Sequence, residues 1–93
     1  MNNMNKLFNE QIFYDIAKIV SNEYIGTEKT FTSTRLNGYN LLNSNVCDYA
    51  PSIRVYHDFT KISKVEVNGD YTDGWQLVKP ATMDKILSKV NVI

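Results

Sequence analysis

The residues that could supply a nucleophile and its base are a single cysteine and a single histidine, Cys47 and His57. A thiolate–imidazole pair, with Asp48 or Asp58 orienting the ring, would support covalent catalysis. However, His57 shares one face of an alternating segment with apolar residues, and a histidine on such a face is more often a hydrogen-bonded structural residue. A lone cysteine usually behaves as a small buried hydrophobe. We therefore predict that the chain is not an enzyme.

Oxygen-bearing side chains gather between residues 68 and 74, where the sequence is Asn-Gly-Asp-Tyr-Thr-Asp-Gly. Asn68, Asp70 and Asp73 could bind calcium, but the segment lacks the loop length and the terminal glutamate of an EF-hand. Asn, Asp and Gly are also the residues that a hairpin turn requires. We expect a turn here, with no metal and no cofactor. The four glycines are placed at helix ends or turns and form no phosphate-binding loop.

Aromatic residues and both arginines concentrate in the part of the chain that is expected to be β-structure. Tyr and Arg provide large contact areas at binding hot spots, and exposed aromatic rings can also stack on unpaired bases. Successive strand residues point to opposite faces, so Arg54, Tyr56 and Asp58 should face away from the core. The predicted partner-binding residues are Arg54, Tyr56, Asp58, Tyr71 and Trp75.

The first element that must support these residues is a helix over residues 5–25. Phe8, Ile12, Phe13, Ile16, Ile19, Val20 and Tyr24 fall within about 160° of the helical circumference, and polar residues fill the other half. An asparagine at position 3 or 5 can cap its start, and Gly26 can end it. We expect the apolar stripe to lie on the core.

The middle of the chain contains the sequence patterns that are typical of β-strands. Threonines favour a strand over residues 27–36, and Asn37-Gly38 favours a tight turn. Residues 52–59 and 63–67 alternate between apolar and polar types, and 75–78 form a final short strand. No clear period marks residues 39–50, which we interpret as an irregular connection.

A second helix is expected to follow Pro80, capped by Thr82, with Asp84 in its first turn. Met83, Ile86, Leu87 and Val90 form its narrow apolar stripe. The order of elements predicts an α+β fold in which N-terminal and C-terminal helices pack on one face of a 3-4 stranded antiparallel sheet. Ninety-three residues suit one core, so we expect residues 1–93 to form a single small domain.

Composition narrows the possible partners. Ten basic residues balance ten acidic ones, and this neutrality does not favour binding through phosphate contacts. One cysteine fits a reducing compartment, and no apolar run is long enough to span a membrane. Eleven asparagines but only three alanines reflect AT-rich codons. We expect a cytoplasmic protein of a low-GC bacterium or of a phage-infected host.

The leading functional hypothesis is a non-enzymatic module that binds another protein; a homodimer is compatible with it. Its narrower form is an inhibitor of a host defence protein, encoded by a phage or mobile element, and rests on analogy to a class. The alternative is a nucleic-acid-binding domain that uses Arg54, Tyr56, Lys64 and Trp75. A small enzyme or an enzyme subunit is the third hypothesis.

Overall fold

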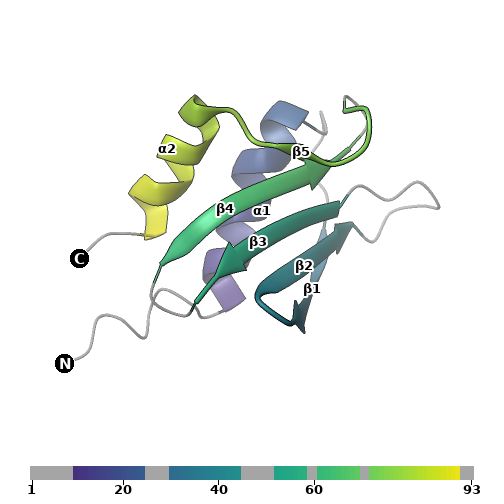
Figure 1. Ribbon diagram of the computed structural model, residues 1–93, viewed down its shortest axis with the longest axis vertical. Coiled ribbons are helices and arrows are strands. Elements are labelled where there is room, and N and C mark those ends of the chain that lie inside the picture. Colours follow the sequence, from purple (N-terminus) through teal and green to yellow (C-terminus); the bar gives the residue numbers. More distant parts are fainter. Residues whose placement is uncertain (1–9, 25–29, 45–51, 59–60, 70–71, 91–93) are drawn as a thin grey trace.

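The computed structural model describes residues 10–24, 30–44, 52–58, 61–69 and 72–90, and it confirms the α+β class. The elements along the chain are α1 (Glu10–Tyr24), β1 (Phe31–Leu36), β2 (Tyr39–Ser44), β3 (Ser52–His57), β4 (Ile62–Asn68), β5 (Gln76–Leu77) and α2 (Pro80–Val90). The strands form one antiparallel sheet in which their spatial order equals their order in sequence (Figure 1). The sheet is therefore a meander, and within the described residues it has five strands where three or four were expected.

The additional strand is β2, which occupies the first half of the segment that was expected to be irregular. The expectation was wrong there because the inward-facing positions of β2 do not carry only apolar side chains. Asn40, Leu42 and Ser44 are buried, whereas Tyr39 and Leu41 on the opposite face are half-buried. Asn40 is tolerated inside because its side chain is hydrogen-bonded to neighbouring strands. Because Asn40 is polar and yet buried, the sequence of β2 does not show the alternation of apolar and polar residues that identifies a strand.

The turn between β1 and β2 agrees with the sequence. Leu36 pairs with Tyr39, so Asn37 and Gly38 alone make the connection. Gly38 has a φ of 91°, a left-handed conformation that glycine adopts without steric cost. This turn fixes the register of β1 against β2, in which Arg35 is opposite Asn40.

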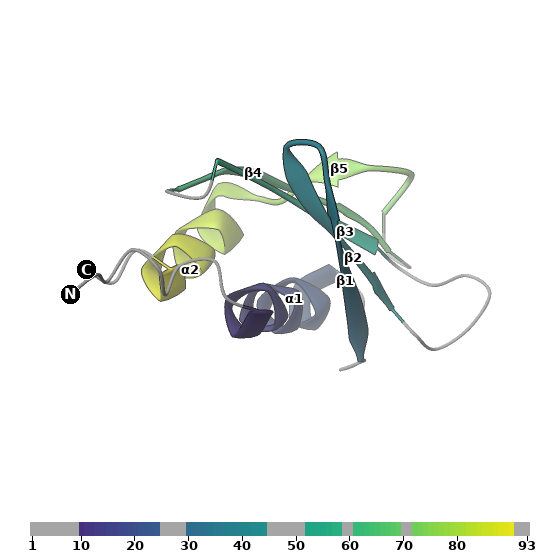
Figure 2. The same ribbon diagram turned by 90° about the horizontal axis from the view of Figure 1, so that it is seen from below.

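The core forms between the inward face of the sheet and the apolar stripes of both helices. Phe13, Ile16 and Val20 of α1 are buried in one cluster with Val55 of β3 and Ile86 of α2. Figure 2 shows both helices on the same side of the sheet. Four residues assigned to the helical stripes are only half-buried and pack at the margin of the core: Ile12, Ile19, Met83 and Leu87.

The beginning of α2 differs from the expectation. Pro80 is its first residue, which suits a ring that fixes φ and has no N–H to satisfy, and the carbonyl of Lys79 accepts from Met83 N at 2.9 Å. Thr82 is therefore not the cap. It is fully buried inside the first turn, and its hydroxyl donates to Glu23 Oε1 of α1. Asp84 lies beyond that turn.

Among the described residues, no helix has the length and apolar character needed to cross a membrane.

Candidate functional site

The face of the sheet opposite the helices carries a group of aromatic and charged side chains that three cross-strand pairs bring together. In the register, Tyr39 is opposite Tyr56, Arg54 is opposite Glu66, and Tyr56 is opposite Lys64. Directly opposite residues on one face have neighbouring side chains. Trp75, just before β5, joins them from the far side of β4. We call Tyr39, Arg54, Tyr56, Glu66 and Trp75 the aromatic–arginine cluster.

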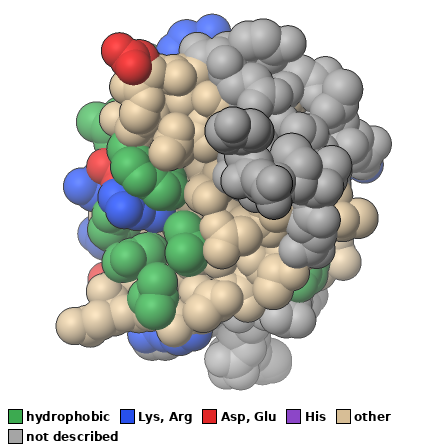
Figure 3. Space-filling model, turned by 90° about the vertical axis from the view of Figure 1, so that its right-hand side faces the viewer, with side chains coloured by type: hydrophobic (Ala, Val, Ile, Leu, Met, Phe, Trp, Pro, Cys, Tyr) green, Lys and Arg blue, Asp and Glu red, His purple; other side chains and the backbone are tan. Residues whose placement is uncertain are grey.

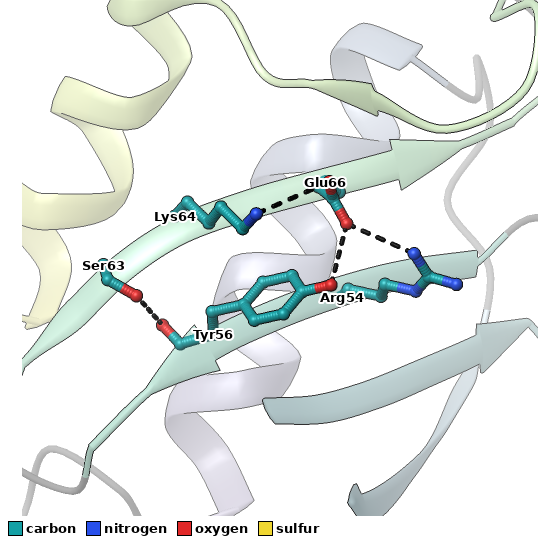
Figure 4. Close-up of polar contacts among 5 residues, drawn as sticks. All are labelled: Arg54, Tyr56, Ser63, Lys64 and Glu66. Atoms are coloured by element: carbon teal, nitrogen blue, oxygen red, sulfur yellow. Dashed lines mark hydrogen bonds and ion pairs between the residues drawn. The ribbon is translucent and has the colours of Figure 1, made fainter. Parts of the chain in front are cut away.

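Glu66 is the centre of this cluster, as Figure 4 shows. Its Oε1 accepts a hydrogen bond from the Tyr56 hydroxyl at 3.0 Å and one from Arg54 Nη1 at 3.3 Å. Lys64 Nζ lies 3.9 Å from Oε2. Only 19% of the Glu66 side chain is exposed, against 31% for Arg54 and 48% for Lys64. The mostly buried carboxylate of Glu66 thus interacts with two cations and a phenol and holds them in place.

The cations also lie over aromatic rings. Arg54 Cζ is 3.8 Å from the centre of the Trp75 ring and 5.8 Å from that of Tyr39, while Lys64 Nζ is 4.5 Å from that of Tyr56. These distances lie in the range of cation–π attraction. The Tyr39 and Tyr56 rings are 4.9 Å apart and tilted by 35°. The cluster is therefore preorganised by its own contacts.

The Tyr56 hydroxyl remains a donor in this setting. Burial raises the pKa of Tyr56, and the hydrogen bond to Glu66 and the charge of that carboxylate raise it further, although Arg54 opposes the change. Ionising the phenol beside Glu66 would create two adjacent negative charges. Tyr56 is thus neutral at ordinary pH.

The structure places the predicted binding residues unequally. Arg54, Tyr56 and Trp75 come together, and Tyr71 lies outside the described residues. Asp58 follows the end of β3, after an irregularity in the register at Tyr56 and His57. Its Oδ1 accepts from Lys61 N at 3.0 Å and its N–H donates to Lys61 O, so Asp58 is bound to the residue that precedes β4. The alternation that assigned Asp58 to the outer face does not extend past His57.

Sequence reasoning missed two members of the cluster. Tyr39 falls in the segment that was interpreted as irregular, and Glu66 was not among the predicted binding residues. The signal that identifies Glu66 was present in the sequence: the alternation in residues 52–57 and 63–67 places Arg54 and Glu66 on the same face. Only the register of the β3–β4 pair, which the sequence does not specify, makes them direct neighbours.

His57 is buried, with 6% of its surface exposed, and is held by structural contacts. Its Nε2 lies 2.8 Å from Asn40 Oδ1 and 3.4 Å from Arg35 Nη1, and its ring stacks at 5.4 Å against Phe13. Burial lowers the pKa of His57, as does the neighbouring Arg35 charge, whereas Asp58 raises it. Cys47, the other residue of the candidate pair, lies outside the described residues.

The oxygen-rich segment after β4 contains hydrogen bonds of its own. Thr72 Oγ1 accepts from Gly69 N at 2.8 Å and donates to Gly69 O at 3.1 Å, and Thr72 N also donates to Gly69 O. Gly74 adopts a φ of 82°. Within the described part of the chain, no three His, Cys, Asp or Glu side chains are close enough to hold a metal ion. Asp70 lies outside that part.

Comparison of the chain with protein-family models, curated proteins and solved structures finds no match.

Proposed function

We propose that this protein is a non-enzymatic module that binds another protein through the aromatic–arginine cluster. The observation that carries the proposal is the position of Arg54, held against Trp75 at 3.8 Å and fixed by Glu66 on the sheet face that the helices leave uncovered. Aromatic residues and Arg are enriched at the centres of protein interfaces. Side chains that are already ordered lose less entropy on binding.

The charges of the outer sheet face favour a protein partner over a nucleic-acid partner. Arg54 and Lys64, the two basic residues of that alternative, both lie within ion-pair distance of Glu66. A phosphate would have to compete with this carboxylate for them. Each cation also covers one face of a ring, Arg54 at Trp75 and Lys64 at Tyr56, which removes surface on which a base would stack.

The narrower form of the proposal is a phage or mobile-element inhibitor of a host defence protein that acts in the cytoplasm of a low-GC bacterium. Its support is the small size, the zero formal charge and the bias to AT-rich codons. A homodimer formed by the same surface would be an alternative partner.

The test begins with capture of partners from a low-GC bacterial lysate, with and without nuclease, followed by mass spectrometry. The affinity of the purified partner is then measured for wild type, Arg54→Ala and Tyr56→Ala. Each truncation should weaken binding at least about tenfold, because central anchors contribute about 2–4 kcal/mol. Trp75 is the only tryptophan, so its fluorescence should change when the partner binds.

Lys18→Ala is the matched control, because Lys18 is an exposed cation on α1, away from the sheet face. It should change the affinity less than about threefold, in line with peripheral contacts. Normal binding by both sheet variants with a defect in Lys18→Ala would place the interface on the helices and refute the proposal. Capture that disappears after nuclease treatment would instead support the nucleic-acid alternative.

A further inference from the structure

A hollow at the edge of the sheet lies between β4, β5 and the first turn of α2. It has a volume of about 220 Å³ and is lined by Ser63, Lys64, Val65, Leu77, Val78, Pro80 and Met83. We call it the edge groove. Its walls are mostly apolar, and Leu77 is a large hydrophobic residue that is 61% exposed. The exposed Leu77 side chain and the hollow beside it together offer a contact surface for one apolar side chain.

The size of the groove argues against a small-molecule ligand. Pockets for drug-sized ligands span about 300–1,000 Å³, which is more than the edge groove holds. The 220 Å³ of the groove suits instead the side chain of one large apolar residue presented by a protein.

The backbone next to the groove is an incomplete strand edge. β5 pairs with β4 only at Glu66 and Val67, and Val78 N donates to Val65 O at 3.1 Å. Among the described residues, no strand pairs with Ile62–Lys64 on the side away from β3. An extended peptide can add to such an edge through backbone hydrogen bonds and place alternate side chains in an adjoining pocket.

The charges around the groove define the chemistry of its occupant. Lys64 contributes to the lining, exposed Lys61 precedes Ser63 by two residues, and exposed Lys79 lies between Val78 and Pro80. Among the described residues no acidic side chain lines the groove, but Asp84 follows Met83 in the sequence and Glu66 follows Val65, and Glu66 Oε2 lies 3.9 Å from Lys64 Nζ. The three lysines outnumber these two carboxylates, so the rim keeps a positive charge that complements carboxylates flanking an apolar anchor.

We propose that the edge groove binds an extended acidic segment of a partner protein, which inserts one apolar side chain between Leu77 and Met83. Carboxylates next to this anchor lie near Lys61 and Lys79, and the backbone of the segment pairs with Ile62–Lys64. This is a second site, beside the aromatic–arginine cluster, and it does not rest on the function proposed for that cluster.

The probe is a library of short random peptides displayed on phage and selected on the full chain. Selected peptides should share one large apolar residue with Asp or Glu within two positions. One selected peptide is then synthesised with a fluorescent label and titrated with wild type, Met83→Glu and Ser88→Glu. A carboxylate in the groove should weaken binding at least about tenfold through like-charge repulsion, while the same charge at exposed Ser88 of α2 should change it less than about twofold.

Two further measurements complete the test. Met83→Leu should bind like wild type, and thermal melting checks that each variant is folded. Methylating the peptide amides one at a time should abolish binding at alternate positions only, because every second N–H of a paired strand points to its neighbour.

Selected peptides without the acidic–apolar pattern, or normal binding by a folded Met83→Glu variant, would overturn the proposal. Loss of peptide binding in Trp75→Ala with normal binding in Met83→Glu would assign the peptide to the aromatic–arginine cluster. That result would refute the groove site and leave the proposed function standing. Normal peptide binding by Trp75→Ala with loss in Met83→Glu supports two separate sites.

Discussion

At the scale of single residues, the contacts of His57 select its neutral form. Asn40 Nδ2 donates to Ser33 Oγ at 3.0 Å, so Asn40 Oδ1 is directed at His57 and accepts from an Nε2–H. The Arg35 guanidinium, 3.4 Å from the same nitrogen, disfavours a second positive charge. The Nε2–H can donate to Asn40 in either protonation state, so burial of His57 and the charge of Arg35, and not this hydrogen bond, lower the pKa of His57 and link its titration to folding.

The pH dependence of stability should reveal this link. Because the pKa of His57 is lowered in the folded state from its ordinary 6.5, the unfolded chain binds the proton more readily. The stabilising contribution of the neutral ring is present above the ordinary pKa and is lost as pH falls toward the folded value. The unfolding free energy should therefore decrease between about pH 7.5 and about pH 5.5, where most carboxylates stay ionised.

Chemical denaturation at both pH values measures the effect, and His57→Gln is the control. Glutamine has no titratable group and can still donate to Asn40, so the variant should show a flatter profile. An identical pH dependence in wild type and variant would show that other groups cause the loss of stability.

At the scale of elements, residues that keep a strict alternation were assigned correctly, and those with mixed types were not. Ile53, Val55 and His57 of β3 are buried as expected, because apolar side chains fill the two inward positions before His57. The inward Asn40 of β2 broke the same pattern, since only its partners on β1 and β3 make it tolerable inside. Hydrogen bonds to other strands cannot be recognised from the local alternation of residue types, and for this reason β2 was not predicted.

The helices show a second limit of periodicity. A stripe identifies the apolar side of a helix but not how far the neighbouring layer extends around it. Ser21, expected on the wet side of α1, is fully buried, while Leu87, expected inside, is half-buried. Thr82 was read as a cap from its residue type, yet its buried hydroxyl donates to Glu23 and joins the two helices.

This difference in burial predicts unequal effects of truncation. Ile16 has no exposed surface, so Ile16→Ala should reduce the unfolding free energy by about 2–5 kcal/mol through lost burial and an unfilled cavity. Leu87→Ala should cost less, because half-buried Leu87 loses fewer contacts. Urea unfolding of both variants, with exposed Lys18→Ala as the reference, measures the order. Losses below about 1 kcal/mol in both would show that the core faces are misassigned.

At the scale of the whole molecule, the neutral charge balance is repeated locally at the site. Ten basic and ten acidic residues cancel over the chain, and in the aromatic–arginine cluster Glu66 offsets part of the charge of Arg54 and Lys64. Long-range attraction of a highly charged partner is therefore weak. What the outer face offers instead is ordered aromatic area with a few directional polar groups, and that combination depends little on ionic strength.

The salt dependence of binding follows from this balance. The affinity of the partner for the aromatic–arginine cluster should change less than about threefold when salt increases from about 50 to about 200 mM, because the cations are internally paired. Phosphate binding through Arg54 and Lys64 would behave differently. Two neutralised phosphates release counterions and would weaken affinity about tenfold over that range.

Titration at several salt concentrations separates the two cases, and Glu66→Gln provides an internal comparison. Removing this carboxylate frees the charges of Arg54 and Lys64, so any binding of single-stranded DNA should increase in the variant. Binding of a protein partner should not increase, because its contact area is unchanged and the order imposed by Glu66 is reduced. A steep salt dependence in wild type, together with tighter DNA binding in Glu66→Gln, would identify nucleic acid as the partner and refute the protein-binding proposal.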